Sequence, residues 1–239
     1  MNPFIIGALL TGYVATLTLV VGILPSTRMR AIVYSVPVPM STLAILDPGL
    51  VDPNILIGLI VNASFFWLVA SGDRFGWHRT SSTLIATAVY VGVSWLFKEL
   101  PGISISTALA FSLVTWILIL PRVRRIPAKR SSPVEGFAIK RMIVTFFTAT
   151  SAVSISSILG PYVVTFPFTG ITLALNYPGS VVPFARSFWV NGLPPLLAFG
   201  TGMVSGKEMG LPIWGAVLVG FTCWGAITGV FAVFQRSST

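Results

Sequence analysis

The stretch that decides the fold occurs twice: residues 42–49 read TLAILDPG, and residues 172–179 read TLALNYPG. Matched residues in the two stretches are separated by a constant number of positions in the chain, and Pro37 and Pro167 upstream are separated by the same number. We call this separation the proline spacing. Seven of the twelve positions that start at Thr42 are identical to their counterparts. Leucine and alanine matches are frequent in any apolar chain, but matched threonine and Pro-Gly at a constant spacing are not. The chain is therefore predicted to contain two related halves.

A second and weaker match lies further along each half. Residues 89–95 read VYVGVSW and residues 217–224 read VLVGFTCW, so that Gly92 is matched by Gly220. This pair is slightly closer together in the chain than the proline spacing, which indicates that only about two residues are lost between the matched stretches. The repeat is therefore predicted to cover four helices in each half, with one helix left between the halves.

The composition is that of a membrane protein. Of the 239 residues, 54% are hydrophobic and only 9% are charged, and the mean hydropathy is +0.89. An ordinary soluble domain carries about 25% charged residues. Lipid tolerates only helices and closed barrels, and no long alternation of polar and apolar residues suggests a barrel. The sequence therefore predicts an all-α polytopic membrane protein, with the lipid bilayer as its surroundings.

Apolar runs bounded by charges, proline or glycine predict about nine transmembrane helices, at 3–24, 31–46, 54–71, 81–97, 103–121, 142–159, 162–177, 187–205 and 211–234. The second and seventh of these runs have only about sixteen residues, whereas a full span needs about 20. They are therefore expected to be broken, tilted or extended by coil. The predicted organisation is a first four-helix repeat at 1–97, a linking helix at 98–121, a basic linker at 122–141 and a second four-helix repeat at 142–239.

Lysine and arginine decide the predicted orientation. With the N-terminus outside, 13 of the 15 basic residues fall in cytoplasmic segments, which are 25–30, 72–80, 122–141, 178–186 and the C-terminal tail. Cytoplasmic loops carry an excess of positive charge, so this orientation is favoured. We expect a multi-pass protein of the cell (inner) membrane with the C-terminus in the cytoplasm. The second half is then inverted relative to the first, which is the 4+1+4 layout of many secondary transporters.

Several classes of protein are excluded by what the chain lacks. Cys223 is the only cysteine and His78 the only histidine, and there are six carboxylates. A disulfide scaffold is thereby excluded, and a metal site or paired acid–base groups are not expected. We therefore expect no enzyme, no catalytic residue, no metal and no cofactor. The net charge of +9 follows from the loop asymmetry and predicts no nucleic-acid partner.

The candidate site lies where the two short helices carry proline, in SVPVPMST at 35–42 and TFPFTGIT at 165–172. Proline removes a backbone donor, and in lipid the freed groups need partners from protein or water. Two such breaks in inverted halves are expected to meet near the midplane and to form a solute site. The candidate residues are Pro37, Pro39, Ser41, Thr42, Asn62, Thr165, Pro167, Thr169, Gly170, Thr172 and Asn191. The alternative is that the prolines only kink the helices, the hydroxyls bond to their own helix, and the asparagines join helices.

Charge is missing from the centre of every predicted helix. Proton-coupled antiport usually needs an ionisable group within the membrane, so coupling through a buried carboxylate is not expected. Passive conduction, facilitated exchange, or binding of an ion by backbone groups and hydroxyls agrees better with the sequence. The basic 122–141 loop is expected to attract anionic lipid, at about 1 kcal/mol per charge.

Two further stretches carry a resemblance to a known family. FPFTGITLAL at 166–175 and VGFTCWG at 219–225 resemble the second and last helices of GlpM, a small bacterial inner-membrane protein with four predicted helices. The resemblance covers about residues 136–236 and is weaker in the first half, where Trp95 stands in place of Cys223. It implies a fused, inverted pair of GlpM-like units. Since the activity of that family is not well defined, the resemblance implies a fold and no reaction.

Three functions agree with these observations. The first is a transporter or channel for a small solute or ion, which a polar cavity between the two breaks would favour. The second is a non-catalytic accessory subunit with partner subunits in a membrane complex, which tightly closed breaks would favour. The third is a lipid carrier or flippase for envelope polysaccharide synthesis, which a lateral groove open to lipid would favour.

Overall fold

The computed structural model describes residues 24–98, 102–125, 159–177 and 180–236, together with six residues between 12 and 21. Every regular element in these ranges is a helix, and none of the described residues forms a strand. The predicted helix at 142–159 and most of the predicted helix at 3–24 lie outside the described residues, as does the linker beyond Arg125.

Five helices in the described ranges are long and apolar enough to cross a membrane. They are α4 (Asn54–Arg74), α5 (Arg79–Lys98), α6 (Ile105–Arg125), α12 (Ile213–Arg236), and α2 with α3 taken together over Thr27–Leu46. The predicted third, fourth, fifth and ninth helices correspond to α4, α5, α6 and α12, with ends that differ by a few residues. The all-α class is therefore confirmed for the described residues.

The two short predicted helices are both interrupted. The first divides into α2 (Thr27–Tyr34) and α3 (Val38–Leu46), and a short 3-10 turn, η1 (Pro48–Leu50), follows. The second divides into the 3-10 helix η2 (Gly160–Thr165) and α9 (Phe168–Asn176). Each interruption falls at the proline that the sequence singled out, because proline has no N–H for the helix and clashes with the preceding turn.

The predicted eighth helix begins earlier than expected and changes its geometry along its length. It consists of α10 (Val182–Ser187), the π-helical segment η3 (Phe188–Gly192) and α11 (Leu193–Glu208). A tight turn then leads into α12. That turn contains Gly210 with φ 78°, and the turn between α4 and α5 contains Gly76 with φ 74°. A side chain is strained in this left-handed conformation, so glycine ends both helices.

Burial separates a central helix from three outer ones. In the most apolar stretch of each helix, 78% of residues are buried in α4, but only 28% in α5, 17% in α12 and 11% in α6. The outer helices expose large apolar side chains such as Leu84, Ile117 and Leu218. Long helices with apolar outward faces are stable in lipid and not in water. The described helices thus indicate a multi-pass membrane protein.

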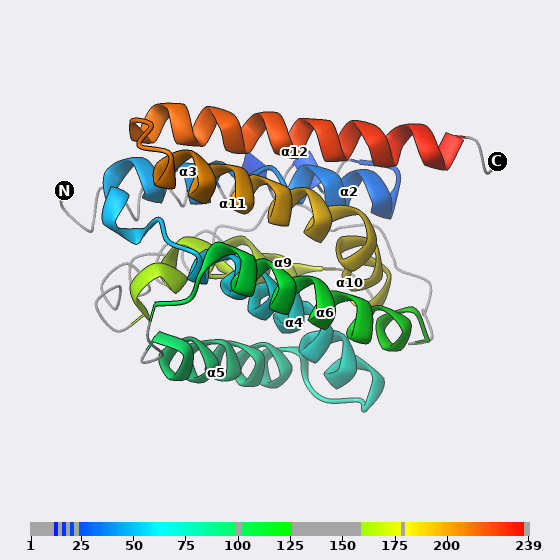
Figure 1. Cartoon of the computed structure of the whole chain (residues 1–239). Helices are drawn as coiled ribbons and strands as arrows, with labels where there is room; N and C mark the ends of the chain where they lie inside the picture. Colours follow the sequence, from blue (N-terminus) through cyan, green and yellow to red (C-terminus); the bar gives the residue numbers. More distant parts are fainter. Residues whose placement is uncertain are drawn as a thin grey trace.

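Segments that the sequence match pairs with each other run in opposite directions in Figure 1. The α2–α3 segment runs from right to left in that view, and the η2–α9 segment runs from left to right. In the same way α4 and α11 run in opposite directions, as do α5 and α12, which lie at opposite edges.

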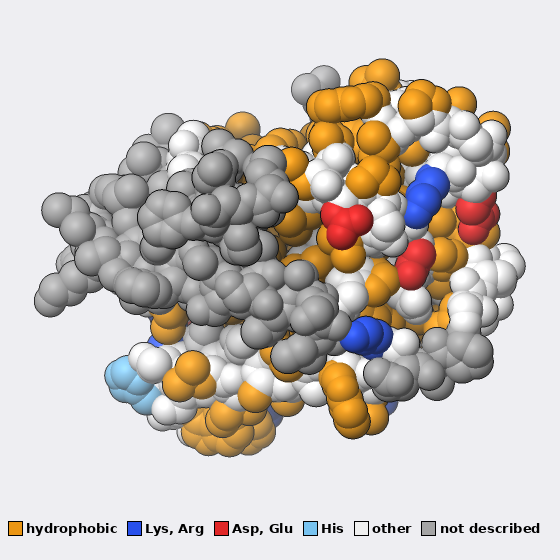
Figure 2. Space-filling model, turned by 90° about the vertical axis from the view of Figure 1, so that its left-hand side faces the viewer, with side chains coloured by type: hydrophobic (Ala, Val, Ile, Leu, Met, Phe, Trp, Pro, Cys, Tyr) orange, Lys and Arg blue, Asp and Glu red, His pale blue; other side chains and the backbone are white. Residues whose placement is uncertain are grey.

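One end of the molecule carries acidic and basic side chains among apolar ones (Figure 2). At this end the Lys207 ammonium donates to the carbonyls of Pro48 and Val51 at 2.7 and 2.6 Å. Asp52 lies in the same loop, and its burial raises the pKa of the carboxyl above the usual value. Hydrogen bonds from Asn54 and the charge of Lys207 lower the pKa by less. Lys207 therefore ties the end of α11 to the loop before α4.

Candidate functional site

The two interruptions have the same backbone geometry. Pro37 has φ −83° and ψ 37°, and Pro167 has φ −77° and ψ 51°. In both segments the residue after the proline donates its N–H to the carbonyl of the residue before it, at 2.9 and 2.8 Å respectively. These are three-residue inverse γ-turns. Each break is therefore a defined turn, not a gentle bend of a continuous helix.

The hydroxyl groups just before the breaks also correspond. Ser35 and Thr165, which are related by the proline spacing, each donate a hydroxyl hydrogen bond to the carbonyl three residues earlier, at 2.7 and 3.2 Å. Each hydroxyl also meets an aromatic side chain from a distant helix. The Tyr90 hydroxyl of α5 lies 2.8 Å from Thr165 Oγ1, and the Trp224 indole of α12 donates to Ser35 Oγ at 3.4 Å.

Two glycines bring long helices against the interrupted segments. A Cβ on Gly58 of α4 would lie 2.2 Å from the Thr165 hydroxyl oxygen. A Cβ on Gly192, at the end of η3, would lie 3.0 Å from the carbonyl oxygen of Ala31 in α2. A side chain at Gly58 would overlap the Thr165 side chain. One at Gly192 would crowd both the Phe188 ring and the Ala31 carbonyl, so glycine suits both positions. We call the separation in the chain between Gly58 and Gly192 the glycine spacing.

The glycine spacing exceeds the proline spacing. The pair Pro53 and Pro183 still has the proline spacing, whereas Gly58 and Gly192 are four residues farther apart in the chain. The four additional residues fall in the part of the chain that contains the π-helical η3. The sequence match instead expected a shorter spacing for the later helices. Apolar helices resemble one another in sequence, so several alignments of the later helices match almost equally well. The four additional residues, about one helical turn, increase the separation of every later pair of corresponding residues.

Gly92 and Gly220, which the sequence match paired, have different surroundings. A Cβ on Gly220 would lie 2.9 Å from the backbone oxygen of Phe199 in α11. A Cβ on Gly92 would meet no described atom within 4 Å. Gly220 therefore serves the contact of α11 with α12, whereas Gly92 has no such contact among the described residues.

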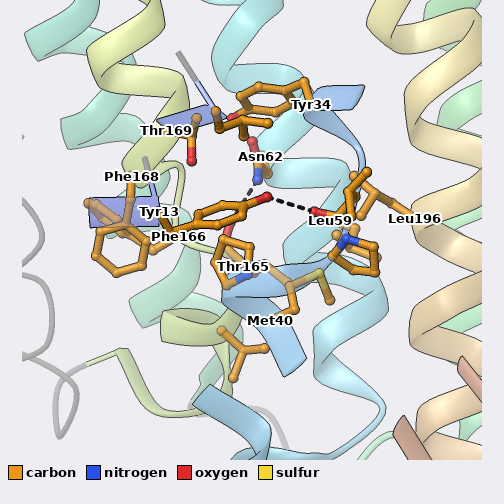
Figure 3. A pocket seen from close by; sticks show the side chains of 15 residues that line it. Tyr13, Tyr34, Met40, Leu59, Asn62, Thr165, Phe166, Phe168, Thr169 and Leu196 are labelled. Carbon is orange, nitrogen blue, oxygen red and sulfur yellow. Dashed lines mark hydrogen bonds between the residues drawn. The ribbon is translucent and has the colours of Figure 1, made fainter. Parts of the chain in front are cut away.

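Both interruptions border one small pocket, of about 40 Å³ (Figure 3). None of the described side chains that line it is charged. Five of the predicted site residues line the pocket: Pro37, Pro39, Asn62, Thr165 and Thr169. A cavity needs roughly 10–15 Å³ of such space to hold a water molecule. The pocket thus has room for very small molecules only.

Asn62 of α4 carries the most informative polar group. Its side chain is 8% exposed, and its Nδ2 donates to the carbonyl of Thr165 at 2.9 Å. Its Oδ1 is buried and has no hydrogen-bond partner among the described residues. Figure 3 shows Asn62 in the middle of the pocket, with the Thr169 hydroxyl turned inward. A buried acceptor without a partner costs about 1–3 kcal/mol, so a bound molecule that donates to it would be stabilised.

The beginnings of α3 and α9 add backbone donors. The first N–H groups of a helix have no acceptor within the helix, and they carry the positive end of its dipole. Neither Pro37 nor Pro167 provides a side-chain hydrogen bond at these ends. Met40 and Thr169, in the first turns of the two helices, both line the pocket. The first N–H group of each helix is already used in its turn and Pro39 has none, so the donors that these helix ends can offer are the later first-turn N–H groups, such as that of Thr169.

Three predicted hydroxyls do not line this pocket. Ser41 donates to the Pro37 carbonyl at 2.8 Å, and Thr42 donates to the Val38 carbonyl at 2.8 Å. Thr172 donates to the Phe168 carbonyl at 3.3 Å. These are bonds of a hydroxyl to its own helix, which the sequence analysis gave as the alternative to a solute role.

The other predicted residues have packing roles. Pro167 forms the second turn, and a Cβ on Gly170 would lie 3.0 Å from both the Phe66 ring and the Tyr34 hydroxyl. Asn191 of η3 donates to the carbonyl and the hydroxyl of Ser187, both at 3.2 Å. The expectation that Asn191 shares a cavity with Asn62 is therefore wrong for this pocket.

Sequence reasoning missed the aromatic part of the lining. Tyr13, Tyr34, Phe166 and Phe168 all line the pocket. The Tyr13 hydroxyl donates to the Val36 carbonyl at 3.3 Å, so it uses a carbonyl beside the first break. Phe166 and Phe168 flank the second proline directly, and that Phe-Pro-Phe pattern was the available signal. Nothing in the sequence distinguished the two tyrosines.

No family model, no curated protein and no solved structure matches this chain. Among the residues that the structure describes, no group of three or more His, Cys, Asp or Glu side chains lies close enough to hold a metal ion. The function is accordingly inferred from the pocket and the arrangement of the helices.

Proposed function

We propose that the chain is a membrane transporter or channel for a small solute or ion, with its site in the pocket between the two interrupted segments. The observation that carries the proposal is the unpartnered Oδ1 of Asn62 in an uncharged pocket beside two helix N-termini. Interrupted helices that place polar backbone groups around a cavity are the usual form of a transport site within a membrane.

The pocket limits what the solute can be. About 40 Å³ accommodates a molecule or ion of roughly the size of a few waters. The N–H groups at the helix ends and the Thr169 hydroxyl are donors for it, and Asn62 is an acceptor. Because no carboxylate lines the described pocket, a proton-coupled mechanism has no carboxyl group there to titrate.

We further propose that the two halves form the 4+1+4 inverted repeat, with α6 as the linking helix. Two sets of observations support this. The breaks share their hydrogen bonds at the proline spacing, and the close glycines and the aromatic contacts recur at the glycine spacing. Matching segments also run in opposite directions (Figure 1). A fused pair of GlpM-like units agrees with this arrangement.

The proposed orientation places the N-terminus outside the cell membrane and the C-terminus in the cytoplasm. The support is the distribution of lysine and arginine in the sequence, and most of these residues belong to the predicted cytoplasmic segments. Single cysteines introduced at Ser131 and at Gly49 would then react with an impermeant reagent from opposite sides of the membrane. Reaction of both from the same side would contradict the orientation and the repeat.

The test of transport is flux into vesicles that contain the purified protein. Thr169→Val removes a hydroxyl that faces the pocket and changes the volume little, so flux should fall at least fivefold while folded yield stays unchanged. Thr42→Val is the matched control, because that hydroxyl bonds to its own helix, and its flux should equal that of the wild type. Equal flux in all three proteins would remove the pocket from the mechanism.

A lipid carrier is the second candidate, because an apolar groove lies between α6, α11 and α12. The groove has a volume of about 540 Å³ and is lined by residues such as Leu113, Leu197 and Ile227. Transfer of a fluorescent lipid between leaflets, with no flux of small solutes, would favour this function. An accessory subunit would instead come out of mild detergent with stoichiometric partners and would show no flux.

A further inference from the structure

A second groove lies far from the pocket along α4, where the ends of three helices meet. It has a volume of about 510 Å³ and lies between the C-terminal ends of α4 and α6 and the beginning of α5. Three arginines line it, and they come from two different helices: Arg74 from α4, and Arg122 and Arg125 from α6. The groove is therefore strongly cationic along one side.

No carboxylate is among the described residues that line the groove. The nearest acidic residue in the sequence, Asp73, is already occupied. Its Oδ2 lies 3.4 Å from the Arg79 guanidinium and accepts the Val181 N–H at 2.8 Å. The three arginines of the groove thus lack an acidic partner within it. Guanidinium groups bind phosphate with two parallel hydrogen bonds, so arginine suits this chemistry better than lysine.

The rest of the lining is apolar and aromatic. Leu68 and Ile85 line the groove beside Trp67 and Trp77. The helices α5 and α6, which flank the groove, have mostly exposed apolar faces, so the groove is continuous with the surface that faces lipid. Trp77 is 51% exposed, and tryptophan at the end of a membrane helix lies at the level of the lipid headgroups.

We propose that this groove binds one anionic phospholipid. The phosphate lies among Arg74, Arg122 and Arg125, and an acyl chain lies along Leu68 and Ile85. Charge complementarity favours an anionic lipid over a zwitterionic one, since three arginines and no carboxylate are among the described residues that line the groove. The apolar lining favours a lipid over free phosphate. The proposal concerns the described residues Arg122 and Arg125 together with α4 and α5, and it is independent of the transport function.

Native mass spectrometry of the purified protein with added lipid tests the proposal. Phosphatidylglycerol should bind more tightly than phosphatidylcholine, and Arg122→Gln with Arg125→Gln should weaken phosphatidylglycerol binding by about 25-fold, at about fivefold per arginine. Arg124→Gln is the matched control on the same helix, because Arg124 does not line the groove, and it should have little effect.

A second measurement covers the case in which the double variant folds poorly. Arg74→Gln changes a different helix and should reduce phosphatidylglycerol binding about fivefold by itself. Millimolar inorganic phosphate should not displace the lipid. Equal binding of the two lipids, an equal loss in Arg124→Gln, or displacement by inorganic phosphate would overturn the proposal.

Discussion

The two interrupted segments share their backbone geometry, but the long helices α4 and α11 present different side chains to the pocket. Asn62 of α4 and Leu196 of α11 are related by the glycine spacing, the one that relates Gly58 to Gly192, and both line the pocket. At these two positions α4 thus supplies a carboxamide where α11 supplies an apolar side chain. Similar helix breaks can therefore border a pocket to which the long helices beside them contribute different polarity.

The two ends of the molecule show a second difference of this kind. Lys207 donates to the carbonyl of Val51 at 2.6 Å, and Asp73 accepts the N–H of Val181 at 2.8 Å. Asp73 and Lys207 are related by the glycine spacing, and the two valines by the proline spacing. Loops at the proline spacing are therefore held to helix ends at the glycine spacing by side chains of opposite charge. A backbone loop offers both donors and acceptors, so either charge can hold it.

The largest expected effect concerns the two close helix approaches. Gly58→Leu and Gly192→Leu should each cost at least about 3 kcal/mol and reduce folded yield sharply, because a side chain has no space against the interrupted segments. Gly92→Leu is the control, since no described atom lies near its Cβ position. Yield after gel filtration and thermal unfolding measure the difference. A loss of folded yield in only one of the two variants would contradict the proposal that Gly58 and Gly192 have corresponding roles.

The next prediction exchanges the side chains that make the pocket asymmetric. Asn62→Leu should lower solute flux at least tenfold. It removes the unpartnered Oδ1 but also the hydrogen bond from Nδ2 to the Thr165 carbonyl, so the two effects offset and thermal stability should change little. Leu196→Asn adds a second carboxamide and should keep the flux. Solute uptake into vesicles at matched protein levels compares both variants with the wild type. Wild-type flux in Asn62→Leu would show that the carboxamide only joins helices.

A moderate effect is expected at the charged loop contacts. Lys207→Met and Asp73→Asn should each lower stability by about 1–2 kcal/mol, since each weakens a charge-assisted hydrogen bond to the backbone. Added salt should reduce the loss in both variants. Unfolding in detergent at low and high ionic strength provides the measurement. A loss at one end only would mean that the two ends are held by different contacts.

A smaller effect should distinguish the two aromatic partners of the breaks. Tyr90→Phe removes a buried hydroxyl 2.8 Å from Thr165 Oγ1 and should cost about 1 kcal/mol. Trp224→Phe removes a donor at 3.4 Å from Ser35 Oγ, near the distance limit of a hydrogen bond, and should cost less. Thermal unfolding of both variants compares the halves directly. The reverse order would place the stronger contact at the first break.

The smallest effect is a pH dependence at Asp52. Its pKa is raised by burial, so the folded protein holds the proton more tightly than the unfolded chain does. The corresponding stability is present below the usual Asp pKa and is lost as the pH rises through the higher pKa of the folded state. Asp52→Asn should therefore flatten the change in melting temperature between about pH 4 and 7. An unchanged slope would mean that other groups cause it.

Local chemistry explains which parts of the site could be predicted. Proline at positions 37 and 167 removes a helix hydrogen bond and clashes with the preceding turn, so a kink or break at each position could be predicted from the chain alone. Asn62 and Thr165 are polar residues in apolar runs, and such residues need partners, which placed them among the candidates. Ser41 and Thr42 have the same chemistry. Whether a hydroxyl faces a pocket or bonds to its own helix depends on the neighbouring helices, and the sequence does not show them.

The sequence by itself determined the all-α class, the long apolar helices and the two breaks, because these follow from composition, length and proline. Only the tertiary structure decided which residues surround the pocket. The four additional residues near η3 are about one helical turn, so later side chains keep nearly the same helix face, and Leu196 of α11 lines the pocket that Asn62 of α4 also lines. A helix face is set by residues per turn, and its partner is set by packing, so this shared lining exists only in the folded chain.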